Sequence, residues 1–138
     1  MTTDLDARLG SLSPVVLSAF RIVFGFLFTV HGCAKLFAWP VDPGTGTGAF
    51  PVGQWPYWYA GVLELVLGLL ITFGLFTRIA AFIASGQMAF AYFTEHQPTG
   101  LLPIANGGEL AVLNCFGFLL LAALGGGAYA LDALRAKR

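Results

Sequence analysis

Residues 110–131 read LAVLNCFGFLLLAALGGGAYAL and contain no Asp, Glu, Lys or Arg. Three further stretches, 22–34, 65–77 and 79–94, are also free of these charged residues. A helix that crosses the hydrocarbon core of a membrane needs about 20 mostly apolar residues. Each stretch reaches that length when one or two flanking charges are tolerated. The sequence therefore predicts four membrane-spanning helices, near residues 14–38, 58–76, 79–96 and 107–124.

The composition of the whole chain agrees with a membrane protein. Of the 138 residues, 57% are hydrophobic and only 10% are charged, and the mean hydropathy is +0.79. A soluble domain carries about 25% charged residues, and a chain this small cannot bury so much apolar surface. A soluble globular enzyme and a disordered chain are therefore excluded. A net charge of zero and the lack of a basic patch exclude nucleic-acid binding. We expect one all-α domain over residues 1–138, a membrane four-helix bundle.

The connections between the predicted helices differ in charge, which predicts an orientation. The connection 39–57 holds four prolines and four glycines and no Lys or Arg, and 97–106 also lacks both cations. The flanking positive charges are Arg8, Arg78, Arg135, Lys137 and Arg138. Positive charges remain on the cytoplasmic side, so both termini are expected there and the loop 39–57 outside. No cleavable signal sequence is recognised. The expected location is the cytoplasmic membrane of a bacterium or archaeon.

Ionisable side chains inside the predicted helices are costly in lipid, so each is a candidate functional residue. Several lie in the outer half of their helices, about 10 Å or less from the outer boundary at 1.5 Å per residue. Stripes of small residues, Gly25 with Gly32 and Gly61 with Gly68, predict where helices pack closely and turn polar groups inward. We expect one outward-facing pocket, whose candidate ligand-binding residues are His31, Lys35, Glu64, His96, Asn106 and Glu109.

The same residues also have a purely structural interpretation, which stays open. Lys35 and Glu64 would then only neutralise each other, because membrane bundles use buried polar pairs in packing. Gln87 and Asn114 are expected to form hydrogen bonds between helices. No tight ligand motif accompanies the histidines, so no metal site is expected. At the inner boundary we expect structural ion pairs among Arg21, Arg78 and Asp132.

Six segments along the chain form an ordered set of motifs: RIVFGFLFTVHGCAKL at 21–36, ELVLG at 64–68, GLFTRIAA at 74–81, MAFA at 88–91, NGGELA at 106–111 and GGGAYALD at 125–132. Together they resemble the DoxX family of small four-helix membrane proteins from bacteria and archaea. The resemblance runs from about Ser18 to Asp132, and the order and spacing of the motifs are more specific than any one of them. Where the family often has a Gly-Pro-Gly turn, this chain has Gly125-Gly126-Gly127.

The resemblance implies a four-helix membrane bundle linked to quinone and thiol redox processes. Members of the family include a subunit of a thiosulfate:quinone oxidoreductase and components of membrane complexes that hold soluble redox enzymes. We therefore expect a membrane subunit whose pocket binds a quinone-like ligand, with no covalent cofactor. If the chain is part of an enzyme, that enzyme is a quinone-linked membrane oxidoreductase. The alternatives are a non-catalytic scaffold for soluble redox enzymes and a small proton-coupled transporter. Membrane lipid is an expected partner, and a homo-oligomer is left open.

Overall fold

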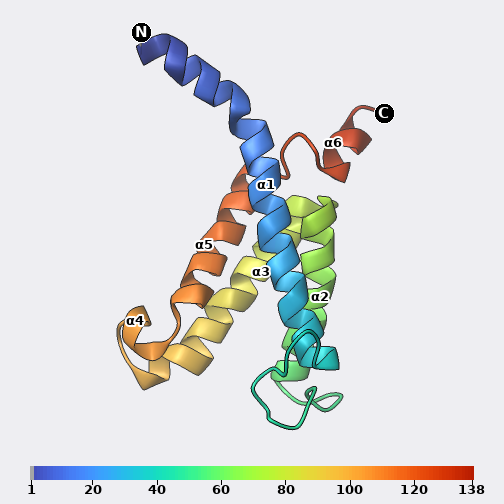
Figure 1. The fold of residues 1–138 in the computed structure, drawn as a ribbon, viewed down its shortest axis with the longest axis vertical. Coiled ribbons are helices and arrows are strands. Elements are labelled where there is room, and N and C mark those ends of the chain that lie inside the picture. Colours follow the sequence, from blue (N-terminus) through green and yellow to red (C-terminus); the bar gives the residue numbers. More distant parts are fainter. Residues whose placement is uncertain (1) are drawn as a thin grey trace.

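The computed structural model describes residues 2–138, and every secondary-structure element in that range is a helix (Figure 1). No strand occurs among these residues, which confirms the all-α prediction. The long helices are α1 (Thr2–Phe37), α2 (Tyr57–Phe73), α3 (Thr77–Ala91) and α5 (Glu109–Leu124). The shorter elements are the π-helix η1 (Tyr92–His96), the 3-10 helix η2 (Gln97–Thr99), α4 (Pro103–Asn106) and α6 (Leu131–Ala136).

The helix boundaries differ from the predicted ones at identifiable places. Helix α1 begins at Thr2 rather than near residue 14 and continues through Pro14 without a break. Helix α2 ends at Phe73 rather than 76 because Gly74 adopts a left-handed conformation, with φ of 73°. The N–H of Gly74 then bonds to Ile71, an arrangement that closes the helix end. The predicted helix 79–96 changes to the wider π-helix η1 in its last turn, and α6 was not predicted.

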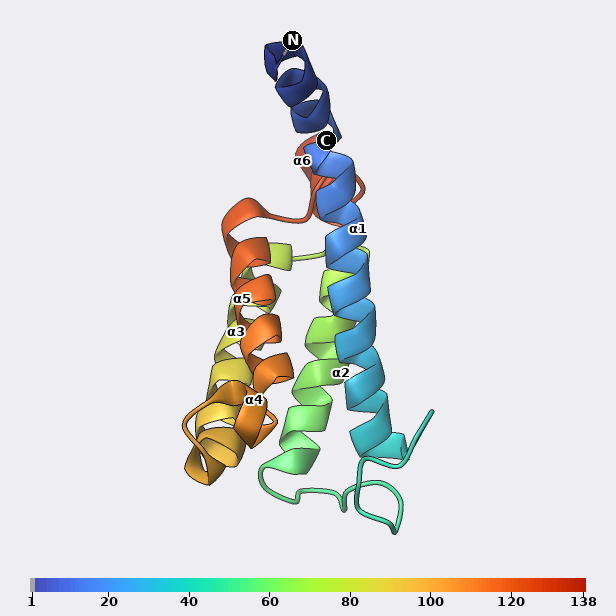
Figure 2. The same cartoon turned by 60° about the vertical axis from the view of Figure 1, so that its left-hand side comes forward.

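The long helices are arranged as two pairs, α1 against α2 and α3 against α5 (Figure 2). Glycines bring the first pair into close contact. A Cβ atom added to Gly25 would lie 2.5 Å from the backbone nitrogen of Thr72. A Cβ on Gly32 would lie equally close, 2.5 Å, to the nitrogen of Leu65. The predicted stripes of small residues are therefore the interface between α1 and α2, where only glycine fits.

A hydrophobic core joins the two pairs in the middle of the bundle and toward the end that carries the chain termini. Phe28 of α1 packs on Phe118 of α5 with ring centroids 4.7 Å apart. The hydroxyl of Ser85 in α3 donates to the carbonyl of Cys115 in α5 at 2.8 Å. The other fully or nearly fully buried apolar side chains are Leu67, Ile71, Ala80, Ala81, Ala84, Met88 and Leu121. This packing leaves the opposite end of the bundle free to open.

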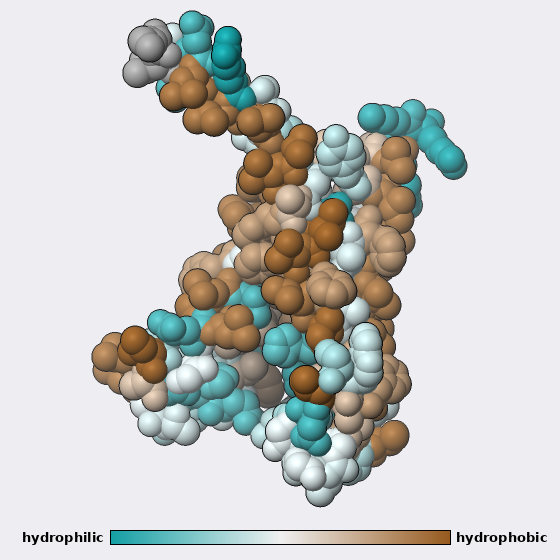
Figure 3. Space-filling view, in the orientation of Figure 1, coloured by the Kyte–Doolittle hydropathy of each residue, from teal (hydrophilic) through white to brown (hydrophobic). Residues whose placement is uncertain are grey.

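The outer surface of the molecule is largely apolar (Figure 3). Phe26, Phe82, Leu113 and Phe116, which belong to α1, α3 and α5, are each more than half exposed. Within residues 2–138, one helix, Thr3–Phe37, is long and apolar enough to cross a membrane. Helices Tyr57–Phe73 and Glu109–Leu124 are apolar but have only 17 and 16 residues. The structure thus supports a membrane-like helical protein.

Candidate functional site

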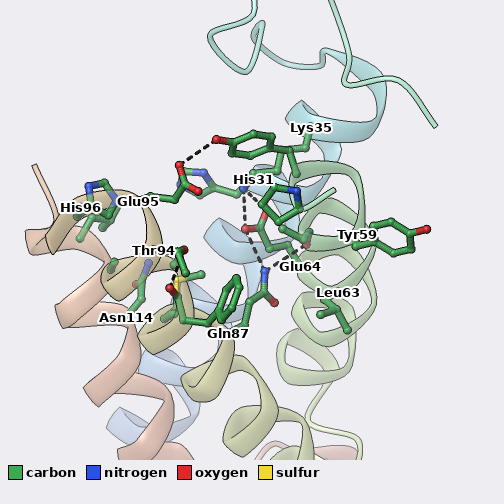
Figure 4. A pocket seen from close by; sticks show the side chains of 18 of the residues that line it. His31, Lys35, Tyr59, Leu63, Glu64, Gln87, Thr94, Glu95, His96 and Asn114 are labelled. Carbon is green, nitrogen blue, oxygen red and sulfur yellow. Dashed lines mark hydrogen bonds and ion pairs between the residues drawn. The ribbon is translucent and has the colours of Figure 1, made fainter. Parts of the chain in front are cut away.

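A cavity of about 440 Å³ opens between the two helix pairs, at the end of the bundle far from the chain termini (Figure 4). Its wall is mostly apolar and aromatic. Trp55, just before α2, lies edge-on to Phe90 of α3, with ring centroids 6.3 Å apart. Phe28, Tyr59, Leu63, Met88 and Leu110 complete this apolar lining. The cavity therefore suits the body of a small hydrophobic molecule.

Three polar side chains from α1, α2 and α3 meet in the wall of this cavity (Figure 4). The Lys35 ammonium nitrogen lies 2.6 Å from both carboxylate oxygens of Glu64. The Gln87 amide nitrogen donates to Glu64 Oε1 at 3.3 Å and to the carbonyl of Ala60 at 3.2 Å. Glu64 is only 3% exposed, so its charge is neutralised locally by Lys35. This arrangement, the Lys35–Glu64–Gln87 cluster, holds α1, α2 and α3 together beside the cavity.

The Lys35–Glu64–Gln87 cluster retains unused hydrogen-bonding capacity. The amide oxygen of Gln87 is buried and has no hydrogen-bond partner among the described residues. An ammonium group carries three N–H donors, and Glu64 accepts at most two of them here. The Lys35 side chain keeps 22% of its surface exposed, so the third donor is not enclosed. A ligand with polar oxygens could therefore bond to this cluster without breaking its ion pair.

A second polar group lies at the mouth of the cavity. The Tyr57 hydroxyl donates to Glu95 Oε2 at 2.9 Å and so links the start of α2 to η1. His96 Nδ1 lies 3.2 Å from the carbonyl oxygen of Asn106. Because a carbonyl only accepts, Nδ1 is the donor in this contact. The π-turn rotates Glu95 and His96 relative to a regular α-helix, a common feature of functional sites.

The structure brings four of the six predicted pocket residues to one cavity and separates the other two. His31, Lys35, Glu64 and His96 line it. Glu109 does not, because it is the first residue of α5 and its side chain is exposed. Asn106 is buried outside the lining. Its side chain donates to the carbonyl of Gly100 and accepts from the N–H of Gly108, so it shapes the turn before α5.

Several lining residues were not among the predicted pocket residues. Trp55, Tyr57, Thr94 and Glu95 come from a loop or from helix ends, whose conformation the hydrophobic pattern does not specify. Gln87 and Asn114 were expected as interhelical hydrogen-bond partners, and both line the cavity. Gln87 bonds to α2 as expected, whereas the Asn114 side chain forms no hydrogen bond within residues 2–138. The sequence signal that could have found these two was their polarity within otherwise apolar helices.

The opposite end of the bundle holds the predicted inner group, but it is built without direct ion pairs among the described residues. Arg21, only 1% exposed, donates to the carbonyls of Ile71 and Gly126 at 2.8 and 2.7 Å. It also bonds to the carbonyls of Thr72 and Tyr129. The last carbonyls of a helix have no partner within that helix. Arg21 therefore satisfies the end of α2 rather than pairing with Asp132.

Arg78 and Asp132 also bond to the main chain. Arg78 donates to the carbonyls of Ala122, Ala123 and Leu124 at the end of α5. The Asp132 carboxylate accepts from the N–H groups of Phe76 and Thr77, both at 2.9 Å, where α3 begins. Burial alone would raise the pKa of Asp132, but these N–H donors hold it below its usual value. The expected ion pairs are thus not formed. Arg21, Arg78 and Asp132 each contact the end of a helix instead, and helix ends carry partial charges.

The all-helical fold and the long apolar helix α1 define a membrane-associated helical protein. Residues 16–97, more than half of the chain, match the family model DoxX, so the chain belongs to the DoxX family. A protein of Haemophilus influenzae described as uncharacterized is 46% identical over 122 residues, covering 86% of this chain and 90% of that protein. No solved structure matches the chain. The family resemblance expected from the motifs is therefore confirmed.

Proposed function

We propose that α1, α2, α3 with η1, and α5 all cross the membrane, with both termini in the cytoplasm. The exposed apolar side chains on α1, α3 and α5 support this arrangement, because water would solvate them poorly. The termini and the turn that carries Arg78 lie at one end of the molecule, as the distribution of Lys and Arg requires (Figure 1). Helix α2 has 17 residues, about 26 Å at 1.5 Å per residue, so the bilayer would be slightly thinned around it.

The cavity would then open toward the outer face of the membrane, and we propose that it binds a quinone-like ligand. Its volume of about 440 Å³ lies within the usual range for small-molecule sites. The aromatic wall would hold a flat apolar ring. The observation that carries the proposal is the Lys35–Glu64–Gln87 cluster, which places spare polar groups at one side of an otherwise apolar cavity. The third N–H of Lys35 would donate to a ring carbonyl.

In this proposal the chain is the quinone-binding subunit of a membrane oxidoreductase, and a partner protein supplies the electrons. Cys33 and Cys115 are both free thiols on different helices, so they do not form a vicinal redox pair. The role proposed for this chain is therefore to bind and orient the ligand. Lys35 would donate to a ring carbonyl, Glu64 and Gln87 would hold the ammonium group in place, and Trp55 and Phe90 would contact the ring.

Fluorescence of Trp55 tests ligand binding directly, because quinones quench nearby tryptophan. The chain has three tryptophans, and replacing Trp39 and Trp58 by Phe leaves only Trp55, which lines the cavity. We expect saturable quenching when decylubiquinone is added to this variant in lipid nanodiscs. The change Lys35→Met with Glu64→Gln should abolish saturation. Glu109→Gln, which alters an acid outside the cavity, is the matched control and should quench as the parent does.

Quenching that rises linearly with quinone and is identical in the Lys35→Met/Glu64→Gln variant would reflect partition into lipid only. That result would reject the quinone site. The Lys35–Glu64 pair would then be structural, as in the scaffold interpretation. Recovery of a soluble redox enzyme with the wild-type protein, and equally with the double variant, would support the scaffold instead.

A further inference from the structure

The first third of α1 extends beyond the rest of the molecule (Figures 1 and 2). Residues 3–13 are all exposed, whereas the contacts with the remainder of the chain begin at Pro14, whose carbonyl accepts from Ala128. At 1.5 Å per residue, residues 2–13 project about 18 Å from the bundle. In the proposed orientation this segment stands in the cytoplasm, where water and not lipid surrounds it.

This projecting segment carries an apolar stripe. Leu5, Leu9, Leu12 and Val16 are 57%, 56%, 53% and 63% exposed, and their spacing is four, three and four residues. Residues with this spacing lie on one face of a helix. Polar residues occupy the other faces of the segment, namely Asp4, Asp6, Arg8, Ser11 and Ser13. The projecting segment does not pack on the bundle. Within a single copy of the chain, its three water-facing leucines therefore have no packing partner.

The stripe continues into the membrane portion of α1 with the same spacing. Ala19, Val23 and Phe26 follow Val16 at intervals of three, four and three residues and are also exposed. The opposite face of α1 packs on α2 through Gly25 and Gly32. Leu5 to Phe26 thus include seven apolar residues whose alternating spacings of four and three repeat every seven residues. They run along the free face of one continuous helix, and this spacing is that of a coiled-coil seam.

We propose that the free face of α1 binds the same face of α1 in a second copy of the chain, with the two helices parallel. The parallel direction rests on the proposed topology, since both copies have their N-termini on one side of the membrane. The residues beside the stripe favour it as well. Asp6 and Arg8 lie on opposite sides of the seam, so the acidic edge of one helix faces the basic edge of its partner.

Two other residues suit this parallel arrangement. Ala19 gives the seam a small side chain near the membrane boundary, where the two backbones can approach. Pro14 lies on the face turned away from the seam, next to the residues that contact the rest of the chain. The contact would begin in the cytoplasm with leucines excluded from water, which supplies the hydrophobic driving force that lipid-facing residues lack. It is independent of the cavity at the other end of the molecule.

Cysteine cross-linking in native membranes tests this interface. In a background where Cys33 and Cys115 are replaced by Ala and Ser, single cysteines are introduced as Leu9→Cys, Leu12→Cys and Ala7→Cys. All three positions are exposed, but Ala7 lies on the opposite face of the helix. With copper phenanthroline as oxidant, we expect disulfide-linked dimers from the first two variants and only background from Ala7→Cys. Equal cross-linking on both faces, or none on the stripe, would overturn the proposal.

The mass of the protein in detergent, measured by light scattering, provides a second test. We expect the wild type to contain two copies and the variant Leu5→Gln/Leu9→Gln/Leu12→Gln one copy. Each copy of the triple variant should still fold, because these leucines lie on the exposed segment that projects from the bundle. A monomeric wild type, or a triple variant that remains dimeric, would overturn the proposal. Quenching of Trp55 by decylubiquinone should be the same in both proteins, so failure of the dimer and failure of the quinone site are distinguishable.

Discussion

The two ends of this bundle use charged side chains in different ways. At the end that carries the termini, Arg21, Arg78 and Asp132 bond to carbonyls and N–H groups at the ends of helices. At the opposite end, Lys35 and Glu64 bond to each other beside a cavity, and Gln87 keeps an amide oxygen without a partner. Backbone groups at helix ends are present in every folded copy, so the first set of contacts is tied to the fold itself. The second set has capacity left for a ligand.

This comparison suggests a criterion for other small membrane bundles. A buried charge whose partners are all main-chain atoms is best interpreted as structural, because moving it would leave helix ends unsatisfied. A buried charge whose partner is another side chain in a cavity can be replaced together with that partner. Substitutions at the two ends of the bundle test whether their charged side chains differ in this way.

The largest loss of stability is expected from Arg21→Met. Methionine fills similar space but donates to none of the four carbonyls that Arg21 satisfies. Ile71 also accepts from the N–H of Gly74, so three carbonyls would lose this donor without replacement. At about 1–3 kcal/mol each, we expect a loss of at least about 3 kcal/mol in all. Thermal unfolding in detergent measures this loss. The control is Arg138→Met, an exposed arginine at the same end, which should unfold as the wild type does.

Lys35→Met is expected to cost less, about 2 kcal/mol, because it removes the charged hydrogen-bond partner of Glu64 from a pair whose lysine is partly exposed. Breaking a fully buried ion pair would cost about 3–5 kcal/mol. Adding Glu64→Gln should restore most of the lost stability, although ligand binding would remain absent. No comparable partner substitution is available for Arg21. The same unfolding assay gives the coupling between the two positions. If the stability losses from Lys35→Met and Glu64→Gln simply add, the two residues are not coupled. This end of the bundle would then be as structural as the other.

Glycines allow the packing of the two ends to be compared with one substitution type. A Cβ on Gly126 would lie 2.6 Å from the Cβ of Ala130, whereas a Cβ on Gly100 would lie 3.6 Å from that of Asn106. We expect Gly126→Ala to cost about 1–3 kcal/mol, as overpacking does. Gly100→Ala should change the unfolding free energy by less than about 0.5 kcal/mol. Equal effects would show that the cavity end is packed as tightly as the closed end.

Acid should weaken the closed end through Asp132. Its pKa is lower in the folded protein than in the unfolded chain, so the carboxylate stabilises the fold above the unfolded pKa, near 3.9. That contribution disappears as the pH falls through the folded pKa. We expect Asp132→Asn to lower stability at pH 7 by about 1 kcal/mol, because an amide has one acceptor oxygen for the two N–H groups that the carboxylate satisfies. The difference from wild type should vanish toward pH 2.

Asp42 provides the matched control for the pH experiment. Its carboxylate accepts N–H bonds from Gly44, Gly46 and Gly48, and those from Gly46 and Gly48 do most to lower its pKa. Asp42 is fully exposed, and these bonds lie within one loop, which can open without unfolding of the helices. We therefore expect Asp42→Asn to change the pH dependence of global unfolding less than Asp132→Asn does. A change as large as that of Asp132→Asn would remove the distinction between the two carboxylates.

Much of the fold and part of the site could be predicted from the sequence, for physical reasons. Helical periodicity placed Gly25 and Gly32 on one stripe, and they indeed pack against α2. The cost of an isolated charge predicted that Glu64 would need a cation, and Lys35 is its partner. Such inferences succeed because they depend on spacing along one helix or on the cost of burial.

The sequence could not give the details that depend on helix ends. Glu109 follows Gly108 directly, and only the observed start of α5 shows that its side chain points away from the cavity. Tyr57 and Glu95 meet because a loop ends at α2 and a π-turn rotates η1. The hydrophobic pattern does not specify where a helix starts or how its last turn is wound. It therefore leaves the start of α2 and the π-turn of η1 undetermined. The preference of Arg21 for carbonyls over Asp132 likewise depends on where α2 stops.

The pairing of helices has a consequence for how the protein is made. Helices α1 and α2 are neighbours in the chain and meet through glycine contacts, so they can associate as soon as both are in the membrane. Helices α3 and α5 are synthesised later and form the second pair. The cavity takes its walls from both pairs, so it exists only after they dock. In the proposed topology and with the proposed ligand, binding would be the last property that the chain acquires during biosynthesis, and a nascent chain that ends at Phe73 could insert into the membrane but could not bind.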